Sequence, residues 1–325
     1  MEDQILNFNT QFAWEPEIEN ADQLPETFSH VIVCGMGGSH LGARLLKEAD
    51  PTLPLTIHSD YGLPREPDER LQSALIVASS YSGETEETLD AARAAAARGL
   101  SVACVTTGGA LATLAREQNL PLILMPKDGT EPRMAIGASM LALARLLRNA
   151  DLERAVREAG TKVDMMAGKE VGANLATSLM ERIPVVYAST ANAGLAYFWK
   201  IALNETGKLP AFYNLFPELC HNELSGFDTT PLARPLAAHL HAIILADTSD
   251  HPRVTKRQQI VRAMLEERGV TVSVVEIEGE TAFDKIFSSV LTGVWVAVAL
   301  AAHYQVPDDA ATPIIADFKA KMLES

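Results

Sequence analysis

Short apolar runs alternate along the chain with longer segments whose apolar residues recur at helical spacing. Runs rich in Val, Ile and Leu indicate strands buried on both faces of a parallel sheet. They predict strands at 31–35, 55–58, 75–79, 101–105, 122–125, 184–189, 239–247 and 272–277. Helical spacing begins near residue 39 and recurs over 85–98, 138–149, 193–204, 254–268, 282–301 and 312–323. This alternation predicts an α/β fold in which helices cover both faces of parallel sheets, a three-layer arrangement.

The strand–turn–helix pattern occurs twice. VIVCGMGGSHLGARLL in the first half corresponds to PVVYASTANAGLAYFWK in the second, which has lost the glycines. A charged and helical connector covers about 150–180. At about 150 residues per domain, a chain of 325 residues is long enough for two domains. We therefore expect a duplicated α/β unit with domains at 1–150 and 151–325.

Charge and cysteine content narrow the function classes. Lys and Arg number 27 against 42 Asp and Glu, a net charge of −15, which argues against binding to nucleic acid or an anionic membrane. Cys34, Cys104 and Cys220 are too widely spaced for a disulfide framework or a zinc site, and the first two lie in apolar runs typical of buried thiols. The acidic N-terminus does not resemble a signal peptide, and the apolar stretch 290–302 is shorter than the roughly 20 residues that span a bilayer. We expect a cytoplasmic protein.

A glycine-rich loop, Gly35–Ser39, ends the first predicted strand and begins a helix. Glycines allow the backbone to approach a ligand closely, and a helix N-terminus offers free N–H groups to an anion. A dinucleotide fold is the alternative, because Asp60 follows the second strand where a ribose-binding acid would lie. Position 40 is His rather than the third glycine of that fingerprint, which weakens this alternative.

A second polar loop, Ser80-Tyr81-Ser82-Gly83-Glu84-Thr85, follows the third predicted strand. Three hydroxyls at a helix start can bind an anion, although ordinary N-capping of the helix by Ser82 or Thr85 is the better explanation when the loop is taken alone. Two such loops at the carboxyl edge of one sheet can converge on one ligand. No Walker lysine follows the glycines, so a monophosphate ester fits better than a nucleoside triphosphate.

Together, strand-GMGGS-helix and strand-SSYSGETEET-helix resemble the sugar isomerase (SIS) domain, a phosphosugar-binding module. The later segments Asn204-Glu205-Thr206-Gly207 and Cys220-His221-Asn222-Glu223, with a C-terminal Thr-Pro…Lys helix, are similar to bifunctional phosphoglucose/phosphomannose isomerases. The resemblance covers almost the whole chain. It implies two SIS domains, a sugar monophosphate substrate, and no cofactor or metal.

The resemblance assigns roles to residues of both halves. The residues implied to bind the phosphate are Gly38, Ser39, Ser80, Ser82 and Thr85. The residues implied to act on the sugar are Glu205 as base, His221 for ring opening, Arg133 beside the enediolate, Lys319 near the ring, and Thr312, which leaves room for both C2 epimers. The family pattern also implies a homodimer in which the neighbouring subunit supplies His221.

These residue types suit the interconversion of glucose 6-phosphate and mannose 6-phosphate with fructose 6-phosphate. One carboxylate can move a proton between C2 and C1, a histidine titrates near neutral pH, and a fixed cation stabilises an enediolate. Without the resemblance, Glu205 and Lys319 would be interpreted as solvated surface residues, and His221 as a structural histidine. A non-catalytic phosphosugar-binding regulator is the other hypothesis. Two departures from the family pattern, His40 for Gly and Glu84 for Asn, lie beside the phosphate loops, where Glu84 would oppose an anion.

Overall fold

The computed structural model describes residues 1–228, 230–307 and 313–323, and its contacts divide the chain into two compact units. The N-terminal unit comprises Leu6–Met165 and Gly279–Phe287, and the C-terminal unit comprises Met1–Ile5, Met166–Glu278 and Ser288–Ser325. The boundary predicted at residue 150 therefore falls inside the N-terminal unit. The chain leaves this unit between residues 165 and 166, within the predicted connector.

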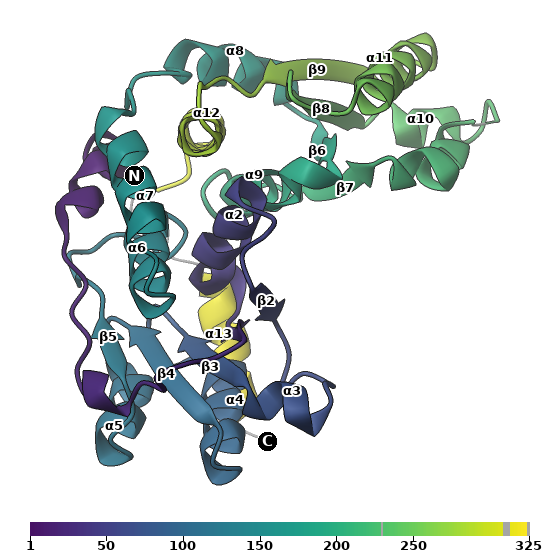
Figure 1. Cartoon of the computed structure of the whole chain (residues 1–325). Helices are drawn as coiled ribbons and strands as arrows, with labels where there is room; N and C mark the ends of the chain where they lie inside the picture. Colours follow the sequence, from purple (N-terminus) through teal and green to yellow (C-terminus); the bar gives the residue numbers. More distant parts are fainter. Residues whose placement is uncertain (229, 308–312, 324–325) are drawn as a thin grey trace. The chain divides into compact units, whose positions relative to one another are not determined.

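The N-terminal unit is built on a parallel sheet with strand order β2-β1-β3-β4-β5 (Figure 1). Its strands are β1 His30–Cys34, β2 Leu55–His58, β3 Ala74–Ser79, β4 Ser101–Thr106 and β5 Leu122–Leu124. Its helices are η1 Phe8–Ala13, η2 Ala21–Gln23, η3 Gly37–His40, α2 Leu41–Ala49, α3 Asp68–Gln72, α4 Glu86–Ala97, α5 Gly109–Glu117, α6 Ile136–Leu146 and α7 Ala150–Lys162.

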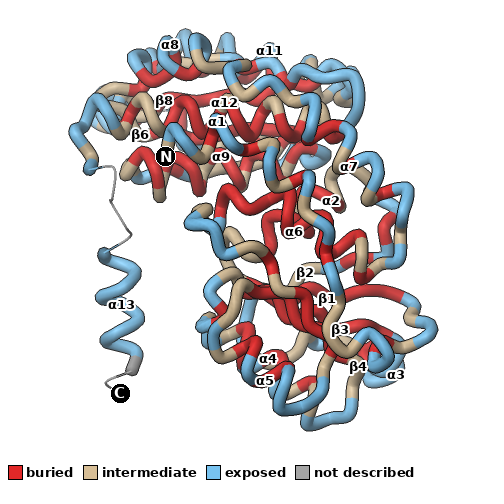
Figure 2. Tube along the Cα trace, turned by 90° about the vertical axis from the view of Figure 1, so that its left-hand side faces the viewer, coloured by how far each residue is buried: buried red, intermediate tan, exposed pale blue. Residues whose placement is uncertain are grey.

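Helices cover both faces of this sheet, so β1 and β3 are buried along their whole length (Figures 1 and 2). Alternate strand residues pack with α4 and α5 in one apolar cluster, which includes Ile32, Ile76, Leu89 and Leu111. Cys34 and Cys104 lie in the same cluster, and burial raises the pKa of each thiol to about 12. Both thiols are therefore protonated at neutral pH, and the prediction that they are buried is confirmed.

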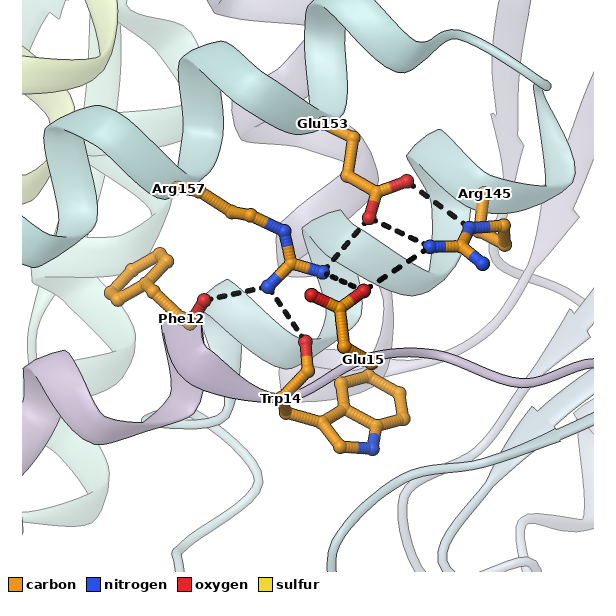
Figure 3. Close-up of polar contacts among 6 residues, drawn as sticks. All are labelled: Phe12, Trp14, Glu15, Arg145, Glu153 and Arg157. Carbon is orange, nitrogen blue, oxygen red and sulfur yellow. Dashed lines mark hydrogen bonds and ion pairs between the residues drawn. The ribbon is translucent and has the colours of Figure 1, made fainter.

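An arginine on α7 holds the N-terminal segment, residues 12–15, against the rest of the N-terminal unit (Figure 3). Arg157 donates to the backbone carbonyls of Phe12 and Trp14 at 2.7 and 2.8 Å, and to the carboxylates of Glu15 and Glu153 at 3.0 and 2.8 Å. The hydrogen bond from Arg145, with its positive charge, holds the pKa of Glu153 below its usual value. The Phe12 ring itself is buried in the core, where it packs edge-on against aromatic neighbours.

The C-terminal unit repeats the architecture with a parallel sheet in the order β7-β6-β8-β9. Its strands are β6 Ile183–Ser189, β7 Phe212–Phe216, β8 Leu240–Ala246 and β9 Thr271–Glu276. Its helices are α8 Lys169–Leu179, η4 Thr190–Asn192, α9 Ala193–Glu205, η5 Glu218–His221, η6 Glu223–Phe227, α10 Arg234–Ala237, α11 Pro252–Glu267 and α13 Pro313–Leu323. The short helix α1 (Glu2–Leu6) and the long helix α12 (Ala282–His303) each contribute residues to both units.

Helix α12 is long and apolar enough to cross a membrane by length and composition. However, 61% of its most apolar window is buried within the protein, as is common for the core helix of a soluble protein. Trp199 of α9 packs against it, and the indole nitrogen of Trp199 donates to the carbonyl of Ser289 at 3.1 Å. The helix predicted over 282–301 is thus confirmed, but the prediction that its apolar part is too short to span a bilayer is wrong.

The predicted strands all form, with ends that differ by at most one residue, but the pattern does not predict the edge strand β7. Its sequence, FYNLF, has a polar residue at its centre and exposes Phe212, so it lacks the apolar run of a central strand. The pattern also does not predict helix α5, because this helix begins at a glycine with no capping side chain.

Candidate functional site

The loops singled out in the sequence meet at one point of the N-terminal sheet. The strand β1 lies between β2 and β3 in the sheet. The chain passes from β1 to β2 on one side and later returns to β3 on the other side, so the order of the strands reverses between β1 and β3. Ligands of open α/β sheets bind in the crevice beyond the carboxyl ends of such strands. Gly35–Ser39 follows β1 and 80–85 follows β3, so both loops border this crevice.

Glycines in the first loop allow close backbone contacts. A Cβ on Gly35 would lie 2.7 Å from the carbonyl oxygen of Ser79, which leaves no space for a side chain. A Cβ on Gly38 would lie 3.0 Å from the backbone nitrogen of Arg133 and 3.0 Å from the carbonyl carbon of Pro132. Arg133 is far apart in sequence from this loop, yet its backbone lies directly against Gly38.

Hydrogen bonds join the two loops through Ser39. Its hydroxyl accepts a hydrogen bond from the backbone N–H of Tyr81 at 3.0 Å, and its carbonyl accepts one from the Ser79 hydroxyl at 2.7 Å. Tyr81 was not among the predicted site residues. Every residue except proline has a backbone N–H, so the sequence does not indicate that this one takes part in the site. Only the folded structure shows this contact.

The hydroxyls of the second loop are organised around Ser80. Ser80 is fully buried; its hydroxyl is 2.8 Å from the Thr85 hydroxyl and accepts from the N–H of Gly83 at 3.1 Å. Ser82 is exposed and accepts from the N–H of Glu84 at 3.2 Å. Thr85 occupies the N-cap position of α4 without a side-chain capping bond, so simple N-capping does not account for its hydroxyl.

The two departures from the family pattern each have a local partner. His40 is buried, with its Nδ1 3.3 Å from Nε of Arg44; burial, assisted by the Arg44 charge, lowers the pKa of His40 to about 4. The carboxylate of Glu84 accepts the N–H of Ala110 at 2.9 Å, at the N-terminus of α5. The negative charge that the sequence places beside the phosphate loop is therefore paired with a helix N-terminus, where an anion is favourable.

Arg133 is a buried cation beside these loops. Its side chain is 7% exposed, and its guanidinium forms an ion pair with Glu131 at 3.1 Å. It lies in the turn that precedes α6, which agrees with the helix-start signal of the preceding proline. The N-terminal unit thus brings together Gly38, Ser39, Ser80 and Arg133, with Ser82 and Thr85 on the same loop.

Glu205 is the last residue of α9 in the C-terminal unit, and it is half-buried. The motif around it builds a tight helix end. Asn204 donates to the carbonyl of Leu209 at 2.8 Å, and a Cβ on Gly207 would lie 2.9 Å from the carbonyl oxygen of Leu203. The sequence Asn-Glu-Thr-Gly therefore ends the helix at the carboxylate and turns the chain into β7.

His221 ends the short helix η5, which follows β7, and it is exposed. Glu223, two residues later, anchors this turn: its carboxylate accepts hydrogen bonds from the hydroxyl of Tyr187 on β6 and from the amide of Asn214 on β7. Burial and the contact with Glu223 raise the pKa of Tyr187. Glu223 belongs to the motif Cys220-His221-Asn222-Glu223, in which the sequence predicts a role only for His221.

The two candidate catalytic residues of this unit, Glu205 and His221, lie at opposite ends of the strands of its sheet. Helix α9 runs back from the carboxyl end of β6, so Glu205 lies near the amino ends of the strands, whereas His221 follows the carboxyl end of β7. Helix α9 has 13 residues and, at a rise of about 1.5 Å per residue, is about 20 Å long, which is the separation of the two ends of the strands. The C-terminal unit does not bring Glu205 and His221 of one chain together.

The loops after β6 and β8 correspond by strand order to those after β1 and β3. Asp247 directly follows β8, where Ser80 follows β3. Its buried carboxylate accepts the N–H and hydroxyl of Ser249 at 2.8 and 2.7 Å, and lies 3.5 Å from the Asn192 amide. A carboxylate thus follows β8 at the position where the hydroxyl of Ser80 follows β3.

The remaining predicted residues lie near the C-terminus. Lys319 is exposed on α13, where the neighbouring Lys321 pairs with Asp317 at 2.7 Å. Thr312 lies outside the described residues. The described part of the chain contains no group of three potential metal ligands among His, Cys, Asp and Glu.

The fold and the loop pair define a class of protein. Two parallel α/β units with a serine-lined loop pair at the carboxyl edge of one sheet form an SIS-type sugar-phosphate protein. Residues 169–322 match the family model for the bacterial phosphoglucose isomerase C-terminal SIS domain. A solved structure of a hypothetical protein from Thermus thermophilus superimposes with a TM-score of 0.67 at 18% identity, covering 99% of this chain and 91% of that one, which shows the shared fold.

Relatives identify the family within this class. A bifunctional phosphoglucose/phosphomannose isomerase from Aquifex aeolicus is 31% identical over 92% of this chain and 91% of its own length. A protein of the same name from Caldicellulosiruptor bescii is 31% identical over 86% of each chain. The chain belongs to the bifunctional phosphoglucose/phosphomannose isomerase family, and the predicted resemblance is confirmed.

Proposed function

We propose that this protein interconverts glucose 6-phosphate and mannose 6-phosphate with fructose 6-phosphate through a cis-enediolate. The observation that carries the proposal is the buried guanidinium of Arg133, whose backbone packs against Gly38 beside the two serine loops. A loop pair that binds a phosphate, with a fixed cation next to it, suits a substrate that develops negative charge during isomerisation. Membership of the isomerase family supports turnover over a purely regulatory binding role.

In this proposal each predicted residue has one task. The hydroxyls of Ser39, Ser80, Ser82 and Thr85 and the backbone at Gly38 bind the phosphate. Glu205 transfers the proton between C2 and C1, while His221 and Lys319 open the sugar ring. Arg133 stabilises the enediolate, and Thr312 leaves space for either configuration at C2. The reaction requires neither a metal nor an organic cofactor, and we propose a cytoplasmic location.

We further propose a homodimer in which His221 acts in the site of the partner chain. The separation of Glu205 from His221 by the length of α9 supports this arrangement, because one chain does not bring the two groups within reach of one sugar. The exposure of His221 is also suited to a contribution in trans.

The activity is tested by a coupled assay of the purified protein with each aldose phosphate. Glu205→Gln should lower kcat by several orders of magnitude while fructose 6-phosphate still stabilises the protein against heat. A Glu205→Gln variant with the wild-type rate would contradict the assignment of the base.

Hybrid dimers test the shared site. Glu205→Gln and His221→Ala chains should each retain only a small residual activity alone. Co-expressed at equal levels they should recover about a quarter of wild-type activity, because half of the dimers are hybrids with one intact site in two. If both residues act within one chain, every hybrid site carries a substitution and no activity returns.

A further inference from the structure

The carboxylate of Glu223 attaches the turn that carries His221 to the sheet. Glu223 uses one carboxylate oxygen for the Tyr187 hydroxyl and the other for the Asn214 amide. Tyr187 and Asn214 are directly paired across the parallel strands β6 and β7, so their side chains lie on the same face of the sheet. The carboxylate of Glu223 therefore bridges two neighbouring strands, with one oxygen bonded to each strand.

The partners of Glu223 are themselves well fixed. Tyr187 is 1% exposed and packs edge-on against Phe216, the last residue of β7. Asn214 accepts the backbone N–H of Leu215 at 2.8 Å, which orients its amide with the nitrogen toward Glu223. A carboxylate held by two oriented donors has little freedom to rotate.

The rest of the turn is bonded mainly to itself. The Asn222 side chain accepts the N–H of Glu223 at 2.6 Å and donates to the exposed carboxylate of Glu218 at 2.9 Å. These bonds shape the segment around His221 but do not connect it to the strands. Leu219 and Phe227, on either side, are buried in the adjacent apolar cluster.

We propose that Glu223 is a positioning residue for His221: it fixes the turn at the sheet edge so that the imidazole is presented in one orientation for ring opening. This inference rests on the proposed isomerase function, since it assigns Glu223 a part in that reaction. Glu223 does not contact the sugar in this assignment, and it acts only through the geometry of the turn. A histidine that must reach a partner chain needs such a fixed base.

The test compares Glu223→Gln with Glu218→Gln, which removes one carboxylate charge from the same turn. A glutamine at 223 retains one acceptor oxygen and loses the second, whereas a glutamine at 218 still accepts from Asn222. Glu223→Gln should lower kcat for glucose 6-phosphate about 10- to 100-fold with KM unchanged within a factor of about two, since the phosphate contacts are untouched. Glu218→Gln should keep the wild-type kcat.

A spectroscopic readout separates this inference from the proposed function. The imidazole signals of His221, identified by their loss in His221→Ala, should shift or broaden in Glu223→Gln but not in Glu218→Gln. An inactive wild-type protein would refute the isomerase function and leave this measurement valid. If Glu223→Gln retains both the wild-type kcat and an unchanged His221 signal, the positioning role is refuted.

Additivity provides the final check. In the His221→Ala background, Glu223→Gln should lower the residual kcat by less than twofold, because a positioning residue has no effect once its target is gone. A full additional 10-fold loss there would show that Glu223 acts independently of His221, and would overturn the inference.

Discussion

The close approach of Gly38 to Arg133 makes a sharp prediction about the Gly38→Ala variant. The added methyl would lie 3.0 Å from two backbone atoms of the Pro132–Arg133 segment, several tenths of an ångström inside an ordinary contact. Backbone atoms cannot move aside as a flexible side chain does, so the loop and the arginine must separate. Overpacking of this kind costs about 1–3 kcal/mol of stability.

The expected catalytic effect is larger than the effect on folding. Misplacement of a catalytic group by a fraction of an ångström to 1 Å can lower the rate by about 100-fold, equivalent to about 2.7 kcal/mol. We therefore expect kcat/KM of Gly38→Ala to fall by about 100-fold at temperatures where the variant is fully folded. Steady-state kinetics on glucose 6-phosphate and a thermal unfolding curve measure the two effects separately.

Gly37→Ala is the matched control in the same loop. Gly37 has a positive φ of 52°, but a Cβ there would meet no atom within 4 Å. It should lose about 1 kcal/mol of stability from backbone strain and less than tenfold in kcat/KM. Equal losses of activity in the two variants would show that loop strain, and not displacement of Arg133, determines the rate, and would refute the reasoning.

Other regions give further predictions. Arg157→Ala should lower the free energy of unfolding in urea by about 2–4 kcal/mol, because four hydrogen bonds to the N-terminal segment and Glu153 are lost; a change below 0.5 kcal/mol would contradict this. The folded-state pKa of Glu153 is lowered, so its contribution to stability is present above its unfolded value of 4.5 and is lost as the pH falls through the folded value; Glu153→Gln should flatten this acid dependence in urea titrations. Glu84→Gln should change KM by less than about threefold, because the carboxylate faces Ala110; a large fall in KM would show that its charge repels the substrate. Asp247→Ser should create a second phosphate site per chain, detected by calorimetry with inorganic phosphate, and a stoichiometry that stays at the wild-type value would refute the comparison of the two loop pairs.

The positions of the two polar loops could be predicted because their sequence pattern is local. Glycines and hydroxyls between a strand and a helix can bind an anion wherever such a loop occurs. Ser80 is buried in the expected loop. The role of Glu84 could not be predicted in the same way. Its partner is the N–H of a residue on another helix, and the direction of a side chain depends on elements that the local pattern does not contain.

The sequence by itself determined the parallel α/β units, the loops that border the first sheet and the family of the chain, because hydrophobic periodicity and short motifs act over a few residues. Only the tertiary structure decided that Arg133 packs on Gly38, that Asp247 occupies the second loop pair, and that Glu223 anchors the turn of His221. Each of these depends on a contact between segments distant along the chain. Such contacts are set by strand order and packing, which no local pattern encodes.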